Sequence, residues 1–386
     1  TIKAKATADA TGFKIAATGN TSYAGMFEIQ KAGTAANSNG FNMNGGAGTD
    51  KSIAFYTYGD SGNPLAFLTE ESMAETIIDE YTIAESNAAA PTEKLTLWYT
   101  QSAPATGVAN TWMEYSLPLG NGQFGASLFG GVARDEILFN EKTLWSGGPG
   151  EYGNYLPFGS VYIDDLSGDF ENASVQNYYR DLNLKTATGS VSYENAEGVK
   201  FTRQYIASNP DKAVVTKITA SEAGKLNFRI SMVSGKPTVK AETTYKNGYA
   251  QFSGKLQTVS YNATLKVVAK GGYTSTGAEG ITVEEADEVL IVLMGSTDFV
   301  GNDASHHNGR APYLADDNKA IVDAVAQKGW DAVYADHVAD HQSYFNRVDF
   351  QLDGVENNVP TNQLITDYNA ASGARNHMLE LLYYQY

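Results

Sequence analysis

The stretch of residues 112–149, WMEYSLPLGNGQFGASLFGGVARDEILFNEKTLWSGGP, constrains the fold more than any other part of the chain. Pro118 fixes its own φ and pushes Leu117 out of the helical region, so this segment starts extended. The Gly-Asn-Gly run at residues 120–122 is a turn of the kind that needs positive φ. Residues 123–129 are rich in apolar side chains and bounded by glycines, which predicts a strand that pairs back across this turn.

A second hairpin is expected directly after the first. Gly130 and Gly131 interrupt the strand, and residues 132–139 predict another hairpin that turns around residues 133–135. The chain then reaches Trp145 at the edge of a Gly-Gly-Pro loop. Two tight hairpins that lead into an aromatic-tipped loop are typical of the rim of a large antiparallel sheet.

Strand-like segments continue at regular intervals as far as residue 294, and turn residues separate nearly all of them. No convincing helical period is found between residues 98 and 299. We therefore predict a mainly β fold for residues 91–312, with two large antiparallel sheets packed face to face. Besides the rim, the expected strands are residues 161–163, 213–219, 226–233, 249–253, 263–269, 280–284 and 288–294.

Residues 1–90 have a different pattern, with short alternating segments between Gly, Asn and Ser turns and then an acidic, Ala-rich linker. This spacing predicts a small all-β module. Residues 39–42 and 59–60, with residues 66–68 after them, are similar to the closing part of a β-trefoil repeat of the carbohydrate-binding type. A lectin-like module and a structural β appendage both remain open, and the appendage is favoured.

The spacing of apolar residues changes from strand-like to helical in residues 313–386. The expected elements are helices at residues 317–328, 330–348 and 376–386 and a short strand at residues 350–352. His337 and His341 are four residues apart and would share one helix face. A metal site would need a third ligand, which the sequence does not place beside them, so we favour a packed histidine pair.

Composition excludes several classes of partner. The formal net charge is −17 and the sequence has no basic patch, which argues against nucleic acid and anionic membrane surfaces. The chain has no cysteine, no apolar run of the ~18 residues that a membrane span needs, and no Walker or dinucleotide glycine pattern. We expect no cofactor and no metal, whereas a neutral sugar is compatible with the many Tyr and amide side chains.

Several motifs between residues 97 and 149 together carry a resemblance to a known family. Residues 97–99, residues 104–105 and Trp112 match the way its N-terminal domain begins. The runs that follow in order and spacing are LPLGNG at 117–122, FGG at 129–131, NE at 140–141 and LWSGGP at 144–149. The sequence resembles glycoside hydrolase family 95, the α-L-fucosidase family that also includes some α-L-galactosidases. Further along, the Arg203 position and the corner at Ser208 and Pro210 match as well.

The resemblance implies a β-supersandwich related in fold to galactose mutarotase, then a helical linker and an (α/α)6 barrel that begins within residues 313–386. It also implies inverting hydrolysis of terminal α-L-fucosides or α-L-galactosides of glycans. In the family the acid is a Glu and the base is an Asn assisted by an Asp, all on the barrel. None of those motifs falls within residues 1–386, so we assign no catalytic residue.

We therefore expect the non-catalytic N-terminal part of a glycosidase, secreted, periplasmic or on the cell surface of a bacterium. Both ends of the sequence look like cuts in a longer protein. The glycan would be bound through a barrel that follows, or that a second chain supplies against the apolar face of Met378, Leu379, Leu382 and Tyr383. The alternative is a carbohydrate-binding or scaffolding protein without hydrolase activity.

The candidate site residues are Asn140, Glu141, Trp145, Tyr152 and Tyr155. A carboxylate near aromatic side chains on a loop can line a sugar pocket or contact the barrel. In the competing structural interpretation, Asn140 caps a turn, Glu141 binds backbone amides and Trp145 packs against the barrel or linker. We favour the structural interpretation, and Tyr152 and Tyr155 would share whichever role Trp145 has.

Overall fold

The computed structural model describes residues 86–103, 111–148, 151–170, 174–235, 241–301, 307–352, 354–370 and 375–386, together with three short strands nearer the N-terminus. The chain divides into two compact units, Thr1–Ile77 and Ile78–Tyr386. In the first unit, β1 (Phe13–Ala17) and β2 (Phe27–Lys31) form an antiparallel hairpin. The trefoil-like residues 39–42 and 59–60 lie outside the described residues.

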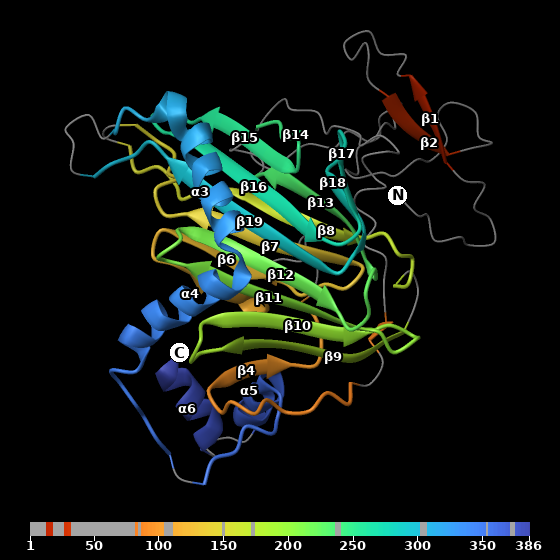
Figure 1. Ribbon diagram of the computed structural model, residues 1–386, viewed down its shortest axis with the longest axis vertical. Helices are drawn as coiled ribbons and strands as arrows, with labels where there is room; N and C mark the ends of the chain where they lie inside the picture. The colour runs from red at the N-terminus through yellow and green to blue at the C-terminus, as the bar shows by residue number, and fades with distance from the viewer. Residues whose placement is uncertain are drawn as a thin grey trace, which may run out of the picture. The chain divides into compact units, whose positions relative to one another are not determined.

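Two sheets build the second unit (Figure 1). The first sheet has ten strands, which in spatial order are β14 (Thr244–Lys246), β15 (Tyr249–Lys255), β16 (Ser260–Lys270), β19 (Glu288–Thr297), β12 (Ala213–Ala220), β11 (Lys200–Ser208), β10 (Thr188–Glu194), β9 (Ser174–Asn183) and β3 (Thr82–Ile83), with β4 (Thr96–Tyr99) also paired to β9. The second sheet has seven strands, β17 (Tyr273–Thr276), β18 (Ile281–Ala286), β13 (Leu226–Ser234), β8 (Gly159–Asp165), β7 (Arg134–Glu141), β6 (Phe124–Leu128) and β5 (Leu117–Gly120). Among the described strands all pairings are antiparallel except that of β3 with β9. The predicted fold of two packed antiparallel sheets is confirmed.

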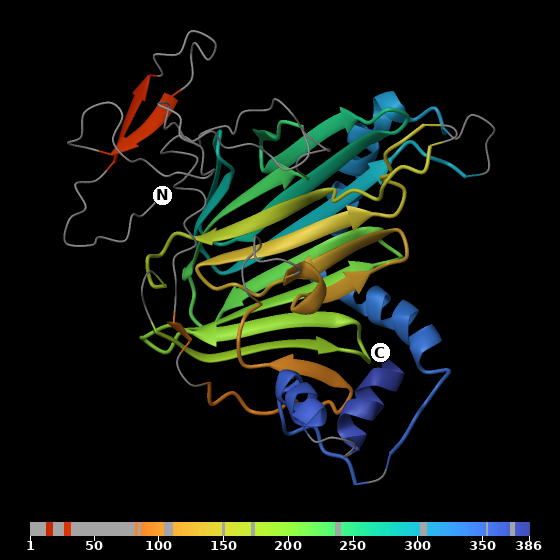
Figure 2. The same cartoon turned by 180° about the vertical axis from the view of Figure 1, so that it is seen from behind.

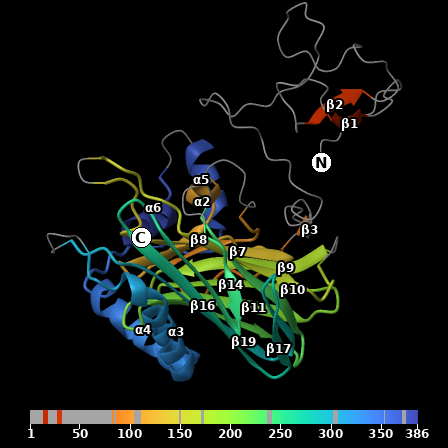
Figure 3. The same ribbon diagram turned by 90° about the horizontal axis from the view of Figure 1, so that it is seen from above.

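The central strands of the ten-stranded sheet, among them β12 and β19, are buried on both faces. Three alternate residues of β19 belong to the core between the sheets, namely Val289, Ile291 and Leu293. The residues between them belong to a second cluster on the opposite face, namely Leu290, Val292 and Met294. There they pack against Val322 of α3 (Leu314–Lys328) and Trp330 of α4 (Trp330–Phe345). Seen from above, α3 and α4 form a third layer on that side of the sheets (Figure 3).

The first predicted hairpin is confirmed, because β5 and β6 pair across residues 121–123. The second turn was placed wrongly at residues 133–135, since Arg134 and Asp135 already belong to β7. The turn is made by the glycine pair before them. Gly130 has φ +73°, and the Asp135 carboxylate accepts the backbone N–H groups of Gly130 and Gly131 at 2.8 and 3.0 Å. A side-chain acceptor within the strand therefore holds the glycine turn.

A buried ion pair joins this glycine turn to the other sheet. Arg203 on β11 and Asp135 are both almost fully buried, with Nη1 3.2 Å from Oδ2. Arg203 also donates to the carbonyl oxygens of Gly131 at 2.6 Å and Val132 at 3.3 Å. The Arg203 position noted in the sequence thus has a structural role, which is to fix the rim of one sheet against the face of the other.

The helical C-terminal segment closes one edge of the large sheet, beside the orange strand β4 in Figure 2. The side chains of Thr361 and Asn357 accept hydrogen bonds from Trp98 on this edge strand. Trp98 donates its backbone N–H to Thr361 at 2.9 Å and its indole N–H to Asn357 at 3.0 Å. Asn357 in turn donates to the carbonyls of Lys94 and Thr96. The edge strand is therefore covered, which removes a site for unwanted strand pairing.

Within the described residues, the helices are α3, α4, α5 (Thr361–Ala370) and α6 (His377–Gln385), together with the short α2 (Thr111–Glu114) and the 3₁₀ turn η2 (Ala311–Tyr313). The prediction of no helix between residues 98 and 299 was wrong by the single turn of α2. The strand expected at residues 350–352 is absent from the described pairings, and Phe350 instead packs on Tyr384 with ring centroids 5.0 Å apart.

The apolar face expected to await a partner on α6 is mostly covered within this chain. Met378 and Leu382 are buried in the main core, and Leu379 packs against it. Asn376 caps the helix by accepting the N–H of Leu379 at 3.0 Å. Tyr383 does remain largely exposed, as do its neighbours Tyr384 and Tyr386.

Candidate functional site

The loop after β7 brings two of the predicted aromatic residues together. Trp145 and Tyr155 form an antiparallel bridge, and their ring centroids are 6.3 Å apart. Both side chains are about half exposed, at 46% and 49%. Tyr152 is fully exposed and contributes its carbonyl, which accepts the indole N–H of Trp145 at 2.9 Å. Gly153 (φ +60°) lies under the indole, where a Cβ would come within 2.4 Å of Nε1.

Glu141 lies at the base of this loop and is fully buried. Its carboxylate accepts hydrogen bonds from Gln123 Nε2 at 2.6 Å and from the backbone N–H and hydroxyl of Thr143 at 2.7 and 2.5 Å. Burial raises the pKa of Glu141, although the bonds from Thr143 and Gln123 oppose the shift. Asn140 accepts the N–H of Glu141 at 2.9 Å. These contacts are those of a carboxylate that organises a turn.

Tyr155 is electrostatically coupled to this carboxylate. Burial, and then the charge of Glu141, raise the pKa of the Tyr155 phenol. The phenol therefore stays protonated as a hydrogen-bond donor at neutral pH. Four of the five predicted residues, Asn140, Glu141, Trp145 and Tyr155, thus gather at one place on the rim, and Tyr152 projects into solvent.

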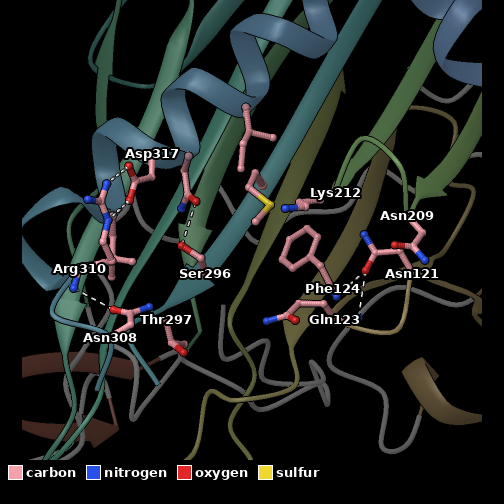
Figure 4. A pocket seen from close by; sticks show the side chains of 14 residues that line it. Asn121, Gln123, Phe124, Asn209, Lys212, Ser296, Thr297, Asn308, Arg310 and Asp317 are labelled. Atoms are coloured by element: carbon pink, nitrogen blue, oxygen red, sulfur yellow. Dashed lines mark hydrogen bonds and ion pairs between the residues drawn. The ribbon is translucent and has the colours of Figure 1, made fainter. Parts of the chain in front are cut away.

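A cavity of about 350 Å³ opens at the end of the sandwich. Its walls come from the β5–β6 turn, the β11–β12 turn, the end of β19, and the segment from residue 308 into the first turns of α3 (Figure 4). The polar part of the lining is formed by Asn121, Gln123, Asn209, Lys212, Ser296, Thr297, Asn308, Arg310, Asp317 and Asn318, which the sequence pattern did not connect. The apolar part of the lining is formed by Phe124, Met294, Leu314 and Ile321.

Glu141 stands behind the wall of this cavity. Gln123 lines the cavity and donates to Glu141, and Thr297 lines it and contacts the hydroxyl of Thr143, which donates to the same carboxylate. Glu141 itself is not among the lining residues. The predicted site residues and the cavity are therefore neighbours that share a hydrogen-bonded wall.

The lining contains one carboxylate, that of Asp317. Arg310 holds it through Nε at 2.9 Å and through Nη2, so both carboxylate oxygens are engaged. Inverting glycoside hydrolysis needs an acid and a water-activating group about 6.5–9.5 Å apart across the sugar. The residues that line the cavity offer no second carboxyl group for such a pair.

The histidine pair on α4 is explained by packing. His337 Nε2 lies 3.0 Å from the carbonyl oxygen of Thr186, and His341 Nε2 lies 2.8 Å from that of Leu184. The two rings stack with centroids 6.5 Å apart, and burial lowers the pKa of His337. In the part of the chain that the structure describes, no cluster of three His, Cys, Asp or Glu side chains is arranged to hold a metal ion. No helix there is long and apolar enough to cross a membrane.

Family comparisons match both parts of the second unit. The glycosyl hydrolase family 65 N-terminal domain matches residues 97–156 and 150–302, which together are more than half of the 386 residues. The glycosyl hydrolase family 95 catalytic domain matches residues 329–386.

Two relatives and one solved structure are similar to about two thirds of this chain. The chain is 28% identical over 317 residues to alpha-L-fucosidase 2 of Arabidopsis thaliana, covering 67% of this chain and 37% of that protein. It is 24% identical over 319 residues to the probable alpha-fucosidase A of Aspergillus niger, covering 68% of this chain and 39% of that protein. A putative kojibiose phosphorylase from the human microbiome aligns in structure with a TM-score of 0.43 and 9% identity, over 68% of this chain and 39% of that one. The chain spans less than two fifths of the length of these relatives. Its β-sandwich belongs to the glycosyl hydrolase family 65 N-terminal domain family.

Proposed function

We propose that this chain is the non-catalytic N-terminal part of a glycosidase that removes terminal α-L-fucosyl or α-L-galactosyl groups from glycans with inversion. The sandwich supports a catalytic barrel that continues from residue 386. The observation that carries the proposal is the match of residues 329–386 to the family 95 catalytic domain, which begins after the sandwich and α3. The names of the two fucosidase relatives support the sugar class.

The chemistry of the described residues is consistent with a supporting role. Glu141 is held by three hydrogen bonds behind the cavity wall, and Asp317 is held by Arg310. Neither carboxyl group is placed to protonate a leaving oxygen while a partner activates water. We further propose that the exposed Trp145 and Tyr155 rings contact either the barrel or the outer part of a bound glycan.

The test is hydrolysis by a protein that extends these residues through a complete family 95 catalytic domain. Aryl α-L-fucoside and aryl α-L-galactoside are the substrates, and NMR identifies the first anomer released. We expect turnover of at least one substrate with the β-anomer appearing first. Initial release of the α-anomer would refute inversion, and hydrolysis of neither sugar would refute the glycosidase assignment.

A second candidate is a carbohydrate-binding protein without hydrolase activity. The exposed Trp145 and Tyr155 pair near a small cavity with amide side chains in its lining favours it, because aromatic faces and amides are used in sugar recognition. It predicts glycan binding by the extended protein without turnover. An array of glycans that gives no binding to the extended protein removes this candidate.

A further inference from the structure

We propose that the cavity at the end of the sandwich binds an acidic sugar, a single polyhydroxyl ring that carries one carboxylate or sulfate group.

The size of the cavity selects a small ligand. Its volume of about 350 Å³ lies near the lower end of the roughly 300–1,000 Å³ that ligand pockets span. The lining combines apolar side chains, among them Met294, Leu314 and Ile321, with polar side chains. The apolar side chains suit the C–H face of a sugar ring, and the polar side chains suit its hydroxyl groups.

The walls carry one uncompensated positive charge. The carboxylate of Asp317 is paired with Arg310, so this pair is neutral as a unit. Lys212 stands on the opposite side of the cavity (Figure 4), and no described residue forms an ion pair with it. In a chain of net charge −17, this cavity is therefore a locally cationic site. A charge-assisted hydrogen bond from the ammonium group would select an anionic ligand.

Two amides beside the cavity are held in known orientations. Gln123 uses its amide N–H to donate to Glu141, which leaves its carbonyl oxygen as an acceptor. Asn308 uses its carbonyl oxygen to accept the N–H of Arg310 at 2.8 Å, which leaves its amide N–H as a donor. One fixed acceptor and one fixed donor among the lining residues suit hydroxyl groups, which both donate and accept.

The backbone at Lys212 provides an independent observation. Lys212 ends the β11–β12 turn with φ +57°, in the left-handed region that favours Gly and Asn. A lysine is thus not the residue that the turn itself requires. Backbone strain of this kind gathers at ligand sites, and a role for the side chain in the cavity accounts for it here.

The test uses calorimetric titration of the 386-residue chain at low ionic strength. The probes are glucuronate and glucose 6-sulfate, with glucose and acetate as ligands that each lack one half of the recognised chemistry. We expect at least one acidic sugar to bind about tenfold or more tightly than glucose and than acetate, since a hydrogen bond to a charged group has about this effect. Added salt should weaken the binding.

Two matched variants separate the site from general charge effects. Lys212→Asn removes the ammonium group and suits the left-handed backbone, so binding should weaken about tenfold while thermal stability is kept or raised. Lys200→Asn removes a lysine at the far end of β11, roughly 26 Å from the cavity end of that strand at about 3.3 Å per residue. This variant should bind the acidic sugars as tightly as the parent does.

Three results would overturn the proposal. The first is the absence of measurable binding of both acidic sugars. The second is binding of acetate as strong as that of the more tightly bound acidic sugar, which would leave an anion site without sugar recognition. The third is a Lys212→Asn variant that binds as tightly as the parent.

Discussion

Replacing Arg203 with Met would remove the cation that fixes the rim to the large sheet. The side chain is fully buried, and its Nη1 lies 3.2 Å from Asp135. It also donates to the carbonyl of Gly131 at 2.6 Å and the hydroxyl of Tyr193 at 2.9 Å. The methionine would fill much of the volume but would leave a buried carboxylate without its counter-charge and a carbonyl without its donor.

Breaking a buried ion pair from one side typically costs about 3–5 kcal/mol. Asp135 would keep its bonds from the N–H groups of Gly130 and Gly131 and from the hydroxyl of Tyr205 at 2.5 Å. These remaining donors still stabilise the charge, so we expect a loss near the lower end, about 3 kcal/mol. That is a large fraction of the roughly 5–15 kcal/mol by which a domain is stable.

The assay is urea unfolding of the 386-residue chain, followed by tryptophan fluorescence and far-UV circular dichroism. Arg229→Met is the matched control, because Arg229 pairs with Asp164 and Glu279 but is 35% exposed, and its loss should cost about 0–1 kcal/mol. The double variant Arg203→Met, Asp135→Asn should lose less than the sum of its single variants. A loss below about 1 kcal/mol for Arg203→Met, or one equal to the control, would refute this reasoning.

Three further substitutions test other parts of the fold, at Gly131, Asp181 and Trp145. Gly131→Ala should cost about 3 kcal/mol or more in urea unfolding, because its Cβ would meet the carbonyl oxygen of Arg134 at 1.9 Å, whereas Gly277→Ala, with open space around it, should be nearly neutral. Burial raises the pKa of Asp181 to about 6, so the free energy of unfolding should fall as pH rises from about 4 through 6. Asp181→Asn should lose this pH dependence, and a variant whose unfolding free energy changes with pH as in the parent would contradict the assignment. Trp145→Ala should change the unfolding free energy by less than about 1 kcal/mol, because the ring is 46% exposed, and a loss above 2 kcal/mol would show that the loop is a packing element.

The strands could be predicted because turn residues mark their ends and apolar alternation marks their faces. The regular strands from residue 213 to residue 294 were found on these signals and agree with β12 to β19 except at their boundaries and at the short β14 and β17. The turn at Gly130 was missed because its stabilising acceptor, Asp135, lies inside the next strand. A local propensity reading cannot distinguish such a strand carboxylate from a turn residue.

The cavity could not be predicted, since it forms where segments far apart in sequence meet. Gln123, Lys212 and Asn308 come from three different connections, and none belongs to a motif with chemical meaning of its own. The rim aromatics were found because Trp145 and Tyr155 flank glycines in one short loop. Tyr152 lies between them in the sequence, but its side chain faces solvent. Only its backbone takes part in the bonding of the loop, because its carbonyl accepts the indole N–H of Trp145.

The location of the chemistry is tested most directly by turnover of an aryl α-L-fucoside by the 386-residue chain without a following barrel. We predict no hydrolysis above the uncatalysed background, because Glu141 and Asp317 are both engaged and no acid–base pair faces the cavity among its lining residues. Clear turnover that Glu141→Gln abolishes would place catalysis in the sandwich and contradict the proposed division between support and chemistry.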